Sequence, residues 1–192
     1  MSISEAIIHL RNINSPAKLT EGYKIYMNYQ NQRSRYGKFM FNITLRAAKF
    51  LMNHMWLYYL LNYTWGIITT AIGWIIFGFV NLFLHKKIKE KGKFGPCHYL
   101  LFGNNWGGLE LGIHFFVADN MGSSWTHHTK CHECGHTFQN AIWGPLAIFL
   151  IYIPSYIRYW LDRAGKISSE YNAIWFEGNA STVGEIYYEK IK

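Results

Sequence analysis

Apolar residues gather in one long run near the middle of the chain. From residue 50 to residue 84, 35 consecutive positions carry no lysine, arginine, aspartate or glutamate. An apolar run of more than about 18 residues is typical of a membrane segment. A single helix of this length would extend roughly 50 Å, beyond the ~30 Å core of a bilayer. The run therefore predicts either one tilted span or a hairpin that turns near residues 62–64.

Basic residues on both sides of the run favour the hairpin. Arg46 and Lys49 precede it, and lysines follow it at positions 86, 87, 89, 91 and 93. Positive charges collect on the cytoplasmic side of membrane segments, where they meet anionic lipid headgroups. We therefore expect an integral membrane protein with both ends of this segment on the cytoplasmic side.

Composition agrees with a bilayer setting, because aromatic residues make up 18% of the chain and charged residues only 16%. The net charge of +8 does not indicate nucleic acid, since the lysines follow the apolar run and no nucleic-acid motif accompanies them. Residues 1–10 include Glu5 and do not resemble a cleavable signal peptide. Helical spacing favours a short amphipathic helix at the membrane surface, with a frayed terminus as the alternative; its apolar residues are Ile3, Ala6, Ile7 and Leu10.

Two strands are expected after a break at residues 92–96. The first covers His98 to Phe102, and the second covers Leu109 to Val117, where apolar residues alternate with a period of two. The residues between them favour a turn; they include Asn104, Asn105, Gly107 and Gly108. This pattern predicts a small β-hairpin with one apolar face.

The rest of the chain predicts helices. One begins near Ser124 or Thr126 and leads into a second apolar stretch, residues 141–161, which Pro145 and Pro154 interrupt. A last helix is expected from Glu170 to Tyr188. The predicted fold is mainly α and membrane-embedded, with a small β-hairpin before the central helix. Its parts are an N-terminal amphipathic and basic segment (1–49), the membrane segment (50–84) and a domain at 94–192 that contains the proline-broken, membrane-associated stretch.

The helix after the hairpin carries the most specific pattern of the chain. Residues 131–136, Cys-His-Glu-Cys-Gly-His, contain an H-E-x-x-H motif. Histidines four apart share one helix face, so His132 and His136 can bind one Zn²⁺ while Glu133 acts as a general base. The alternative is a closed structural zinc site made by Cys131 and Cys134 with Cys97 and a histidine at 127, 128 or 136. Three cysteines do not indicate a disulfide framework.

Catalytic zinc usually takes three protein ligands and leaves one position open. Glu177 is the preferred third ligand because it begins an E-x-x-A helical pattern. Glu170, Glu185 and Glu189 are expected to be solvated. If residues 141–161 crossed a bilayer, they would carry Glu177 about 30 Å away from the motif. Glu177 as a ligand therefore requires that stretch to bend back at its prolines.

With these residues the chain resembles the gluzincin type of metallopeptidase. It is more closely similar to uncharacterised bacterial membrane proteins with the pattern H-E-x-G-H-x-x-Q, then G-P, P-S and E-x-x-A. The resemblance covers roughly residues 107–185, and the matching residues are His132, Glu133, Gly135, His136, Gln139, Gly144, Pro145, Pro154, Ser155, Glu177 and Ala180.

The resemblance implies that His132, His136 and Glu177 bind zinc and that Glu133 activates a zinc-bound water. Such proteins often place an aspartate about four residues after the third ligand, where this chain has Ser181. A serine can accept a hydrogen bond from a ligating histidine, but it cannot stabilise charge as a carboxylate does.

The leading functional hypothesis is a membrane-embedded zinc metallopeptidase at the cytoplasmic face of a bacterial membrane, acting on a peptide or membrane protein. Gln139 is expected to contact substrate or a ligand, and His114 or Tyr171 to stabilise the oxyanion. The strand Leu109–Val117 is expected to pair with an extended peptide. The alternatives are a non-catalytic membrane protein stabilised by zinc and a membrane-anchored binding module.

Overall fold

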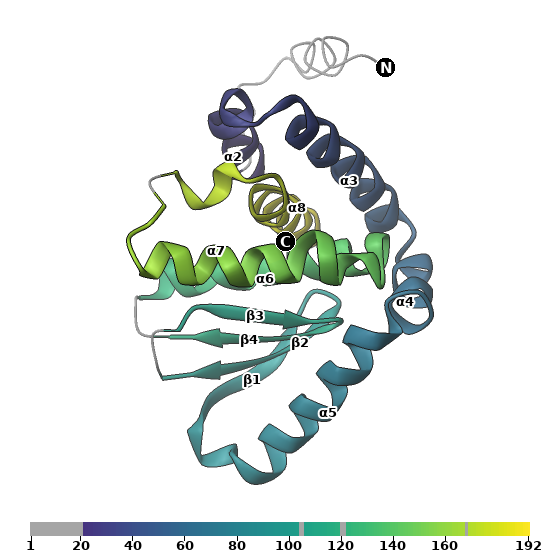
Figure 1. The fold of residues 1–192 in the computed structure, drawn as a ribbon. Coiled ribbons are helices and arrows are strands. Elements are labelled where there is room, and N and C mark those ends of the chain that lie inside the picture. The colour runs from purple at the N-terminus through teal and green to yellow at the C-terminus, as the bar shows by residue number, and fades with distance from the viewer. Residues whose placement is uncertain (1–20, 104–105, 120–121, 168) are drawn as a thin grey trace.

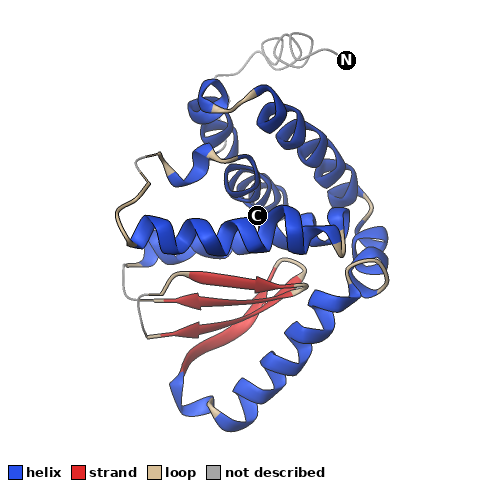
Figure 2. Cartoon of the chain, viewed as in Figure 1, coloured by secondary structure: helices blue, strands red, loops and turns tan. Residues whose placement is uncertain are grey.

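The computed structural model describes residues 21–103, 106–119, 122–167 and 169–192. This part of the chain is mostly helical and contains one small sheet (Figures 1 and 2), as the sequence predicts. The helices are α2 (Glu21–Tyr29), α3 (Arg35–Asn53), α4 (Met55–Tyr63), α5 (Ile67–Phe83), α6 (Ser123–Trp143), α7 (Ile153–Arg163) and α8 (Trp175–Ile191). Short helical turns lie at Gln30–Gln32, His85–Lys87, Ile148–Tyr152 and Tyr171–Ala173. The predicted helix at residues 3–10 and the turn residues Asn104 and Asn105 lie outside the described residues.

The long apolar run forms neither of the two predicted arrangements. Its first residues end α3, so the predicted boundary at residue 49 falls inside a helix, and the remainder forms α4 and α5. These two helices meet at an angle of 83°, instead of lying antiparallel in a hairpin or forming one straight helix. Among the described residues no single helix is both long and apolar enough to cross a bilayer, whereas α4 and α5 together meet that criterion as a bent pair.

A buried amide from α6 explains the bend. The Asn140 side chain donates hydrogen bonds to the Asn62 side-chain oxygen at 2.7 Å and to the Gly66 carbonyl at 3.4 Å. The Thr69 hydroxyl donates to the same Gly66 carbonyl at 3.0 Å and also bonds to Asn140. The Gly66 carbonyl also accepts the first backbone hydrogen bond of α5, from Thr70 N–H at 3.2 Å, so the side-chain bonds tie the start of α5 and the end of α4 to α6.

The sheet has four strands in the order β1-β2-β4-β3, instead of the predicted two. They are β1 (Ile88–Phe94), β2 (Cys97–Phe102), β3 (Gly108–Leu111) and β4 (His114–Ala118). Strand β1 pairs antiparallel with β2, β2 pairs parallel with β4, and β3 pairs antiparallel with β4. The predicted pairing of residues 98–102 with 109–117 as one hairpin is therefore wrong.

Two turns account for the difference. Gly112 has a φ of +71° and interrupts the expected strand 109–117, so its two halves pair with each other as β3 and β4. Gly95 has a φ of +56° and, with Pro96, joins β1 to β2, where only a chain break was expected. The lysines at 89, 91 and 93 thus lie along an edge strand, a position where charge discourages pairing with other chains.

Helices cover both faces of the sheet (Figure 1). Phe115 and Val117 pack in a core with Phe138 of α6, whereas Phe116 packs on the other side with Val80 of α5. All five residues of β4 are buried, which explains why the strand carries apolar residues on both faces. Helix α6, which carries the H-E-x-x-H motif, therefore packs on one face of the sheet, and the apolar helix α5 covers the other face.

Glycines bring α6 and α8 into direct backbone contact. A Cβ atom on Gly135 would lie 1.9 Å from the carbonyl oxygen of Ala180, and one on Gly184 would lie 1.7 Å from that of Cys131. Because these neighbours are backbone atoms, a larger residue fits only if the helices separate. The two glycines set the distance at which α8 presents its side chains to α6.

Replacing Gly135 with alanine should lower the free energy of unfolding by about 1–3 kcal/mol, because the new methyl group collides with the α8 backbone. Urea unfolding of the purified protein, followed by circular dichroism, measures this change. Gly78→Ala in α5 is the control, since a Cβ there meets nothing within 4 Å and alanine favours a helix by up to about 1 kcal/mol. Equal stability of the two variants would contradict the packing argument.

Candidate metal centre

The two motif histidines and Glu177 converge on one point between α6 and α8. The Nε2 atoms of His132 and His136 are 3.1 Å apart. The Oε2 atom of Glu177 lies 3.1 Å from the first and 3.3 Å from the second. The chain after α6 therefore bends back, as a role for Glu177 requires. The bend follows Trp143, where Gly144 has a φ of +51° and Pro145 comes next.

The geometry of these three atoms fits a tetrahedral zinc ion. With metal–ligand bonds of about 2.0–2.2 Å, neighbouring donor atoms of a tetrahedron lie roughly 3.3–3.5 Å apart. The observed separations of 3.1–3.3 Å are close to this value. Glu177 is fully buried, and its Oε2 atom has no hydrogen-bond donor. A buried carboxylate oxygen that faces two imidazole nitrogens is the kind of site a cation stabilises.

A chain of hydrogen bonds orients the first imidazole. Nδ1 of His132 lies 2.7 Å from the Ser181 hydroxyl, which donates to Asn172 Oδ1 at 2.9 Å. Because the Ser181 hydroxyl donates its one hydrogen to Asn172, it accepts in its bond with His132. Nδ1 of His132 is therefore the donor of that bond. The lone pair of Nε2 then points to the metal position. Ser181 thus supports His132 through a hydrogen bond, the role that its hydroxyl allows.

Gln139 orients the second imidazole, so it is not placed to contact substrate. Its Oε1 accepts from Nδ1 of His136 at 2.8 Å, and its amide nitrogen donates to the Phe176 carbonyl and the Asn179 side chain at 2.8 and 2.9 Å. Only 1% of Gln139 is exposed. These bonds fix the orientation of the His136 ring and direct its Nε2 atom toward Glu177.

The charges of the three groups depend on one another in the metal-free protein. Burial alone would raise the pKa of Glu177, but the facing imidazoles outweigh it and lower that pKa. Burial disfavours the charged form of His136, yet the Glu177 carboxylate raises its pKa to about 9. Burial lowers the pKa of His132. One proton on His136 therefore balances the carboxylate, in the position that a cation would take.

Glu133 lies beside this group and lines the same cavity. It is 5% exposed, and burial raises the pKa of its carboxyl to about 8. Strand β3 passes close to it, since a Cβ atom on Gly108 would lie 2.1 Å from Glu133 Oε1. A larger residue at position 108 would therefore require the Glu133 side chain to move. Glu133 can hold a proton near neutral pH at the open side of the metal position.

The cavity has a volume of about 520 Å³ and is walled by α6, β3, α7 and Tyr171. Besides His132, Glu133 and His136, its lining is mostly aromatic and aliphatic: Trp106, Leu109, Leu111, Ile151, Tyr152, Ile153, Tyr156, Tyr159, Trp160 and Tyr171. A few polar groups, from α6, β3 and α7, thus line an otherwise mostly apolar space, which is typical of ligand sites.

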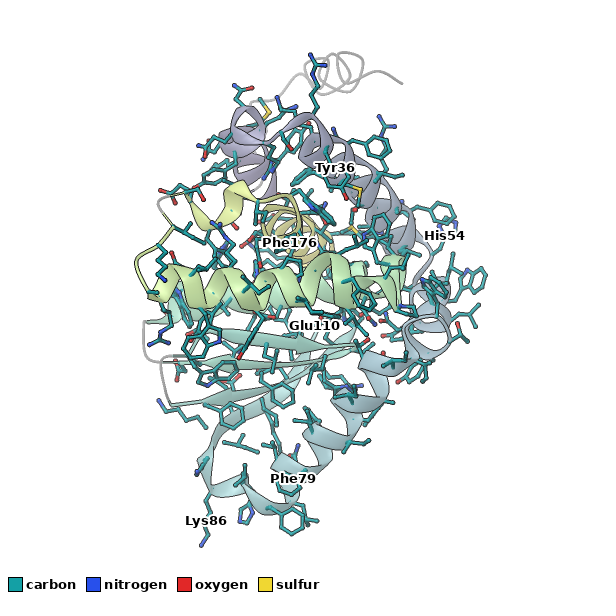
Figure 3. The ribbon with its side chains drawn as sticks, in the orientation of Figure 1. Tyr36, His54, Phe79, Lys86, Glu110 and Phe176 are labelled. Atoms are coloured by element: carbon teal, nitrogen blue, oxygen red, sulfur yellow. The ribbon has the colours of Figure 1, made fainter. Side chains whose placement is uncertain are left out.

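Sequence reasoning assigned no role to three residues of this region. Ser155 donates to Glu177 Oε1, and Asn172 supports Ser181. Glu110 of β3, labelled in Figure 3, lines the cavity; burial raises its pKa to about 8, and its Oε1 atom has no partner. Of these, only Ser155 belongs to a pattern visible in the sequence, Pro-Ser.

The two candidates for oxyanion stabilisation lie in different places. Tyr171 lines the cavity, with its ring 5.9 Å from that of His132. His114 lies on the opposite face of the sheet, where its ring packs against Trp74 and Phe77 of α5. The period of two along a strand sends His114 away from α6. The expectation that His114 contacts a reacting group is therefore wrong.

The cysteine pair does not form the alternative site. The Cys134 thiol lies 3.7 Å from the Cys97 sulfur in the core, close to Tyr58 and Thr137. The Cys131 thiol lies near His127 instead. The two sulfurs thus have separate surroundings, and all three cysteines are free.

Replacing Ser181 with alanine should weaken zinc binding about 10–100-fold, because the orienting partner of His132 is lost. Competition with a chromophoric chelator measures the affinity. The control is Thr182→Val, which removes a neighbouring hydroxyl that bonds only to the Gly178 carbonyl of the same helix. Unchanged affinity in Ser181→Ala would show that the serine does not support the ligand.

Comparison of the chain with protein-family models, with curated proteins and with solved structures gives no significant match.

Proposed function

We propose that this chain is a zinc-dependent peptide hydrolase that works at a membrane surface. The observation that carries the proposal is the convergence of His132, His136 and Glu177 on one point, with Glu133 beside it in an apolar cavity. Two imidazoles and one carboxylate, with a fourth position open to the cavity, are the donor set of a catalytic zinc site. A bound zinc ion would act as a Lewis acid and lower the pKa of water at that position.

Glu133 is the general base of the proposed reaction. Its carboxylate follows His132 on α6 and lines the cavity, so it can reach a water bound at the open position. It takes a proton from the attacking water and then gives it to the nitrogen of the leaving amine. Tyr171 is placed to stabilise the negative charge that develops on the substrate carbonyl.

Strand β3 supplies the peptide-binding edge. It pairs with β4 on one side only, and no described strand lies on its other side. An extended peptide that joins this edge would run directly past Glu133, because Gly108 contacts that side chain. The aromatic and aliphatic cavity walls favour apolar side chains in the substrate.

Exposed apolar side chains support the membrane setting. In α5, Ile75 is 71% exposed and Leu82 is 67% exposed, and Phe149 and Tyr156 near the cavity are 68% and 65% exposed. Such surfaces are unfavourable in water and typical of contact with lipid. We propose that the bent pair α4–α5 inserts into a bacterial cytoplasmic membrane and that nearby lysines meet anionic headgroups on the cytoplasmic side, where the metal centre lies.

Glu133→Gln should lower the rate of hydrolysis at least about 10²-fold, because the amide cannot accept the proton. The rate is measured with a library of internally quenched peptides rich in apolar residues, and zinc content is measured on the same samples. Glu189→Gln makes the same chemical change at an exposed position of α8 and should have no effect. Full activity in Glu133→Gln would exclude this mechanism, and a wild-type chain that binds zinc but cleaves nothing would favour the non-catalytic alternative.

The membrane proposal predicts that the wild-type chain stays with membranes during alkaline carbonate extraction. The double variant Ile75→Asp, Leu82→Asp should be released to a large extent, since each charge in the bilayer centre costs about 2.5–3.5 kcal/mol. Phe39→Asp on α3, at a residue that is 63% exposed but outside the apolar run, is the control. Release of the wild-type chain would contradict the proposal.

A further inference from the structure

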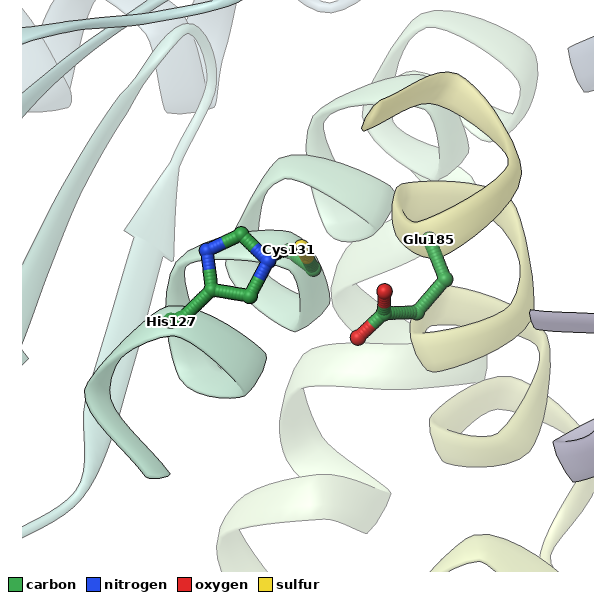
Figure 4. A group of neighbouring side chains, drawn as sticks. All are labelled: His127, Cys131 and Glu185. Atoms are coloured by element: carbon green, nitrogen blue, oxygen red, sulfur yellow. Dashed lines mark hydrogen bonds between the residues drawn. The ribbon is translucent and has the colours of Figure 1, made fainter. Parts of the chain in front are cut away.

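A second group of metal-ligating side chains lies on the same two helices. His127 and Cys131 belong to α6, and Glu185 extends from α8 toward them (Figure 4). The ligand atoms of the three residues lie within 4.8 Å of one another. We propose that His127, Cys131 and Glu185 form a second metal site, which takes zinc or another divalent cation that binds thiolate.

The spacing of the first two residues is that of the motif itself. His127 and Cys131 are four residues apart, as His132 and His136 are, and the pair lies five residues earlier on α6. Side chains at this spacing share one face of a helix. The His127–Cys131 pair of α6 thus faces a glutamate of α8, as the motif histidines do. This second glutamate, Glu185, lies two turns after Glu177 along α8.

The distance between the two α6 ligands fits a zinc ion. The Cys131 sulfur lies 3.6 Å from Nε2 of His127. In a tetrahedral site with a Zn–S bond of about 2.3 Å and a Zn–N bond of about 2.0–2.1 Å, these donor atoms lie roughly 3.5–3.6 Å apart. The helix therefore already holds both atoms at the separation that coordination requires.

Neighbouring side chains orient His127 and Glu185. The His127 ring packs against Tyr188 at a centroid distance of 4.4 Å, nearly perpendicular to it, and also contacts Phe94. Nδ1 of His128 lies 2.9 Å from Glu185 Oε1. His128 is thus placed either to fix the carboxylate as an outer partner or to supply a fourth donor.

Burial distinguishes this group from an ordinary surface cluster. Cys131 is fully buried and Glu185 is 5% exposed. A carboxylate and a thiol in a place with little water are stabilised by a cation between them, and thiolate, imidazole and carboxylate together select zinc-like ions over magnesium or calcium. The expectation that Glu185 is a solvated helix charge is wrong.

The second site is separate from the proposed hydrolytic centre, because none of its three residues lines the cavity. Its place suggests a structural role. Cys131 belongs to the backbone contact with Gly184, so a metal here would link α6 to α8 at a position five residues before the motif pair on α6. Thiolate ligands and a closed position are usual in structural zinc sites.

Cobalt titration of the full-length, metal-stripped protein tests this inference. The wild-type chain should bind two equivalents of Co²⁺, and one of them should produce a thiolate-to-cobalt charge-transfer band in the near ultraviolet. Cys131→Ser should abolish the band and leave one equivalent. The double variant His132→Ala, His136→Ala should also bind one equivalent but keep the band, which separates this site from the hydrolytic centre.

Two further variants keep the test informative if Cys131→Ser disturbs the core. His127→Ala and Glu185→Gln should lose the second equivalent while circular dichroism shows an unchanged fold. Cys134→Ser is the matched control, since this thiol contacts Cys97 instead, and it should keep the band. A single equivalent without the band in the wild type, or a band that survives Cys131→Ser, would overturn the inference.

Discussion

The backbone contact between α6 and α8 is the constraint on which the rest of the structure depends. Gly135 and Gly184 let the two helices touch along their carbonyl groups. At this distance a short side chain such as Ser181 reaches Nδ1 of His132, and Glu177 reaches both motif imidazoles. If the helices were separated by the width of one methyl group, these bonds would lengthen together. The geometry of the candidate metal centre therefore depends first on how the two helices pack.

The buried carboxyl groups in and beside the cavity divide into two kinds. Glu177 faces the imidazoles, which hold its pKa low, whereas burial raises the pKa of Glu133 and Glu110 to about 8. Groups whose surroundings push their pKa values apart are suited to different tasks. A permanently charged carboxylate suits metal binding, and one that titrates near neutral pH suits proton transfer. All three carboxyl groups are almost fully buried. The difference in their pKa values therefore comes from the groups that each one faces.

The sequence predicted the site better than the fold around it. The helix spacing of His132 and His136 and the return of Glu177 depend on local periodicity and on Pro145, so both are visible in a single sequence. The partners Asn172 and Glu110 come from a loop turn and from an edge strand whose position relative to α6 depends on long-range packing. No local pattern marks them. The strand β1 was missed because its lysines alternate along an exposed edge, which resembles a basic segment beside a membrane.

The apolar helices and the cavity are parts of one hydrogen-bonded structure. Asn140 holds the break between α4 and α5, and the Tyr152 hydroxyl lies 3.4 Å from its side chain and donates to Glu110 at 2.8 Å. Since Glu110 lines the cavity, a change in the angle at the break must be taken up by buried polar groups that end at the candidate site. Polar networks of this kind are costly to leave partly satisfied. The bent apolar pair therefore supports the geometry of the cavity, whether or not it contacts lipid as proposed.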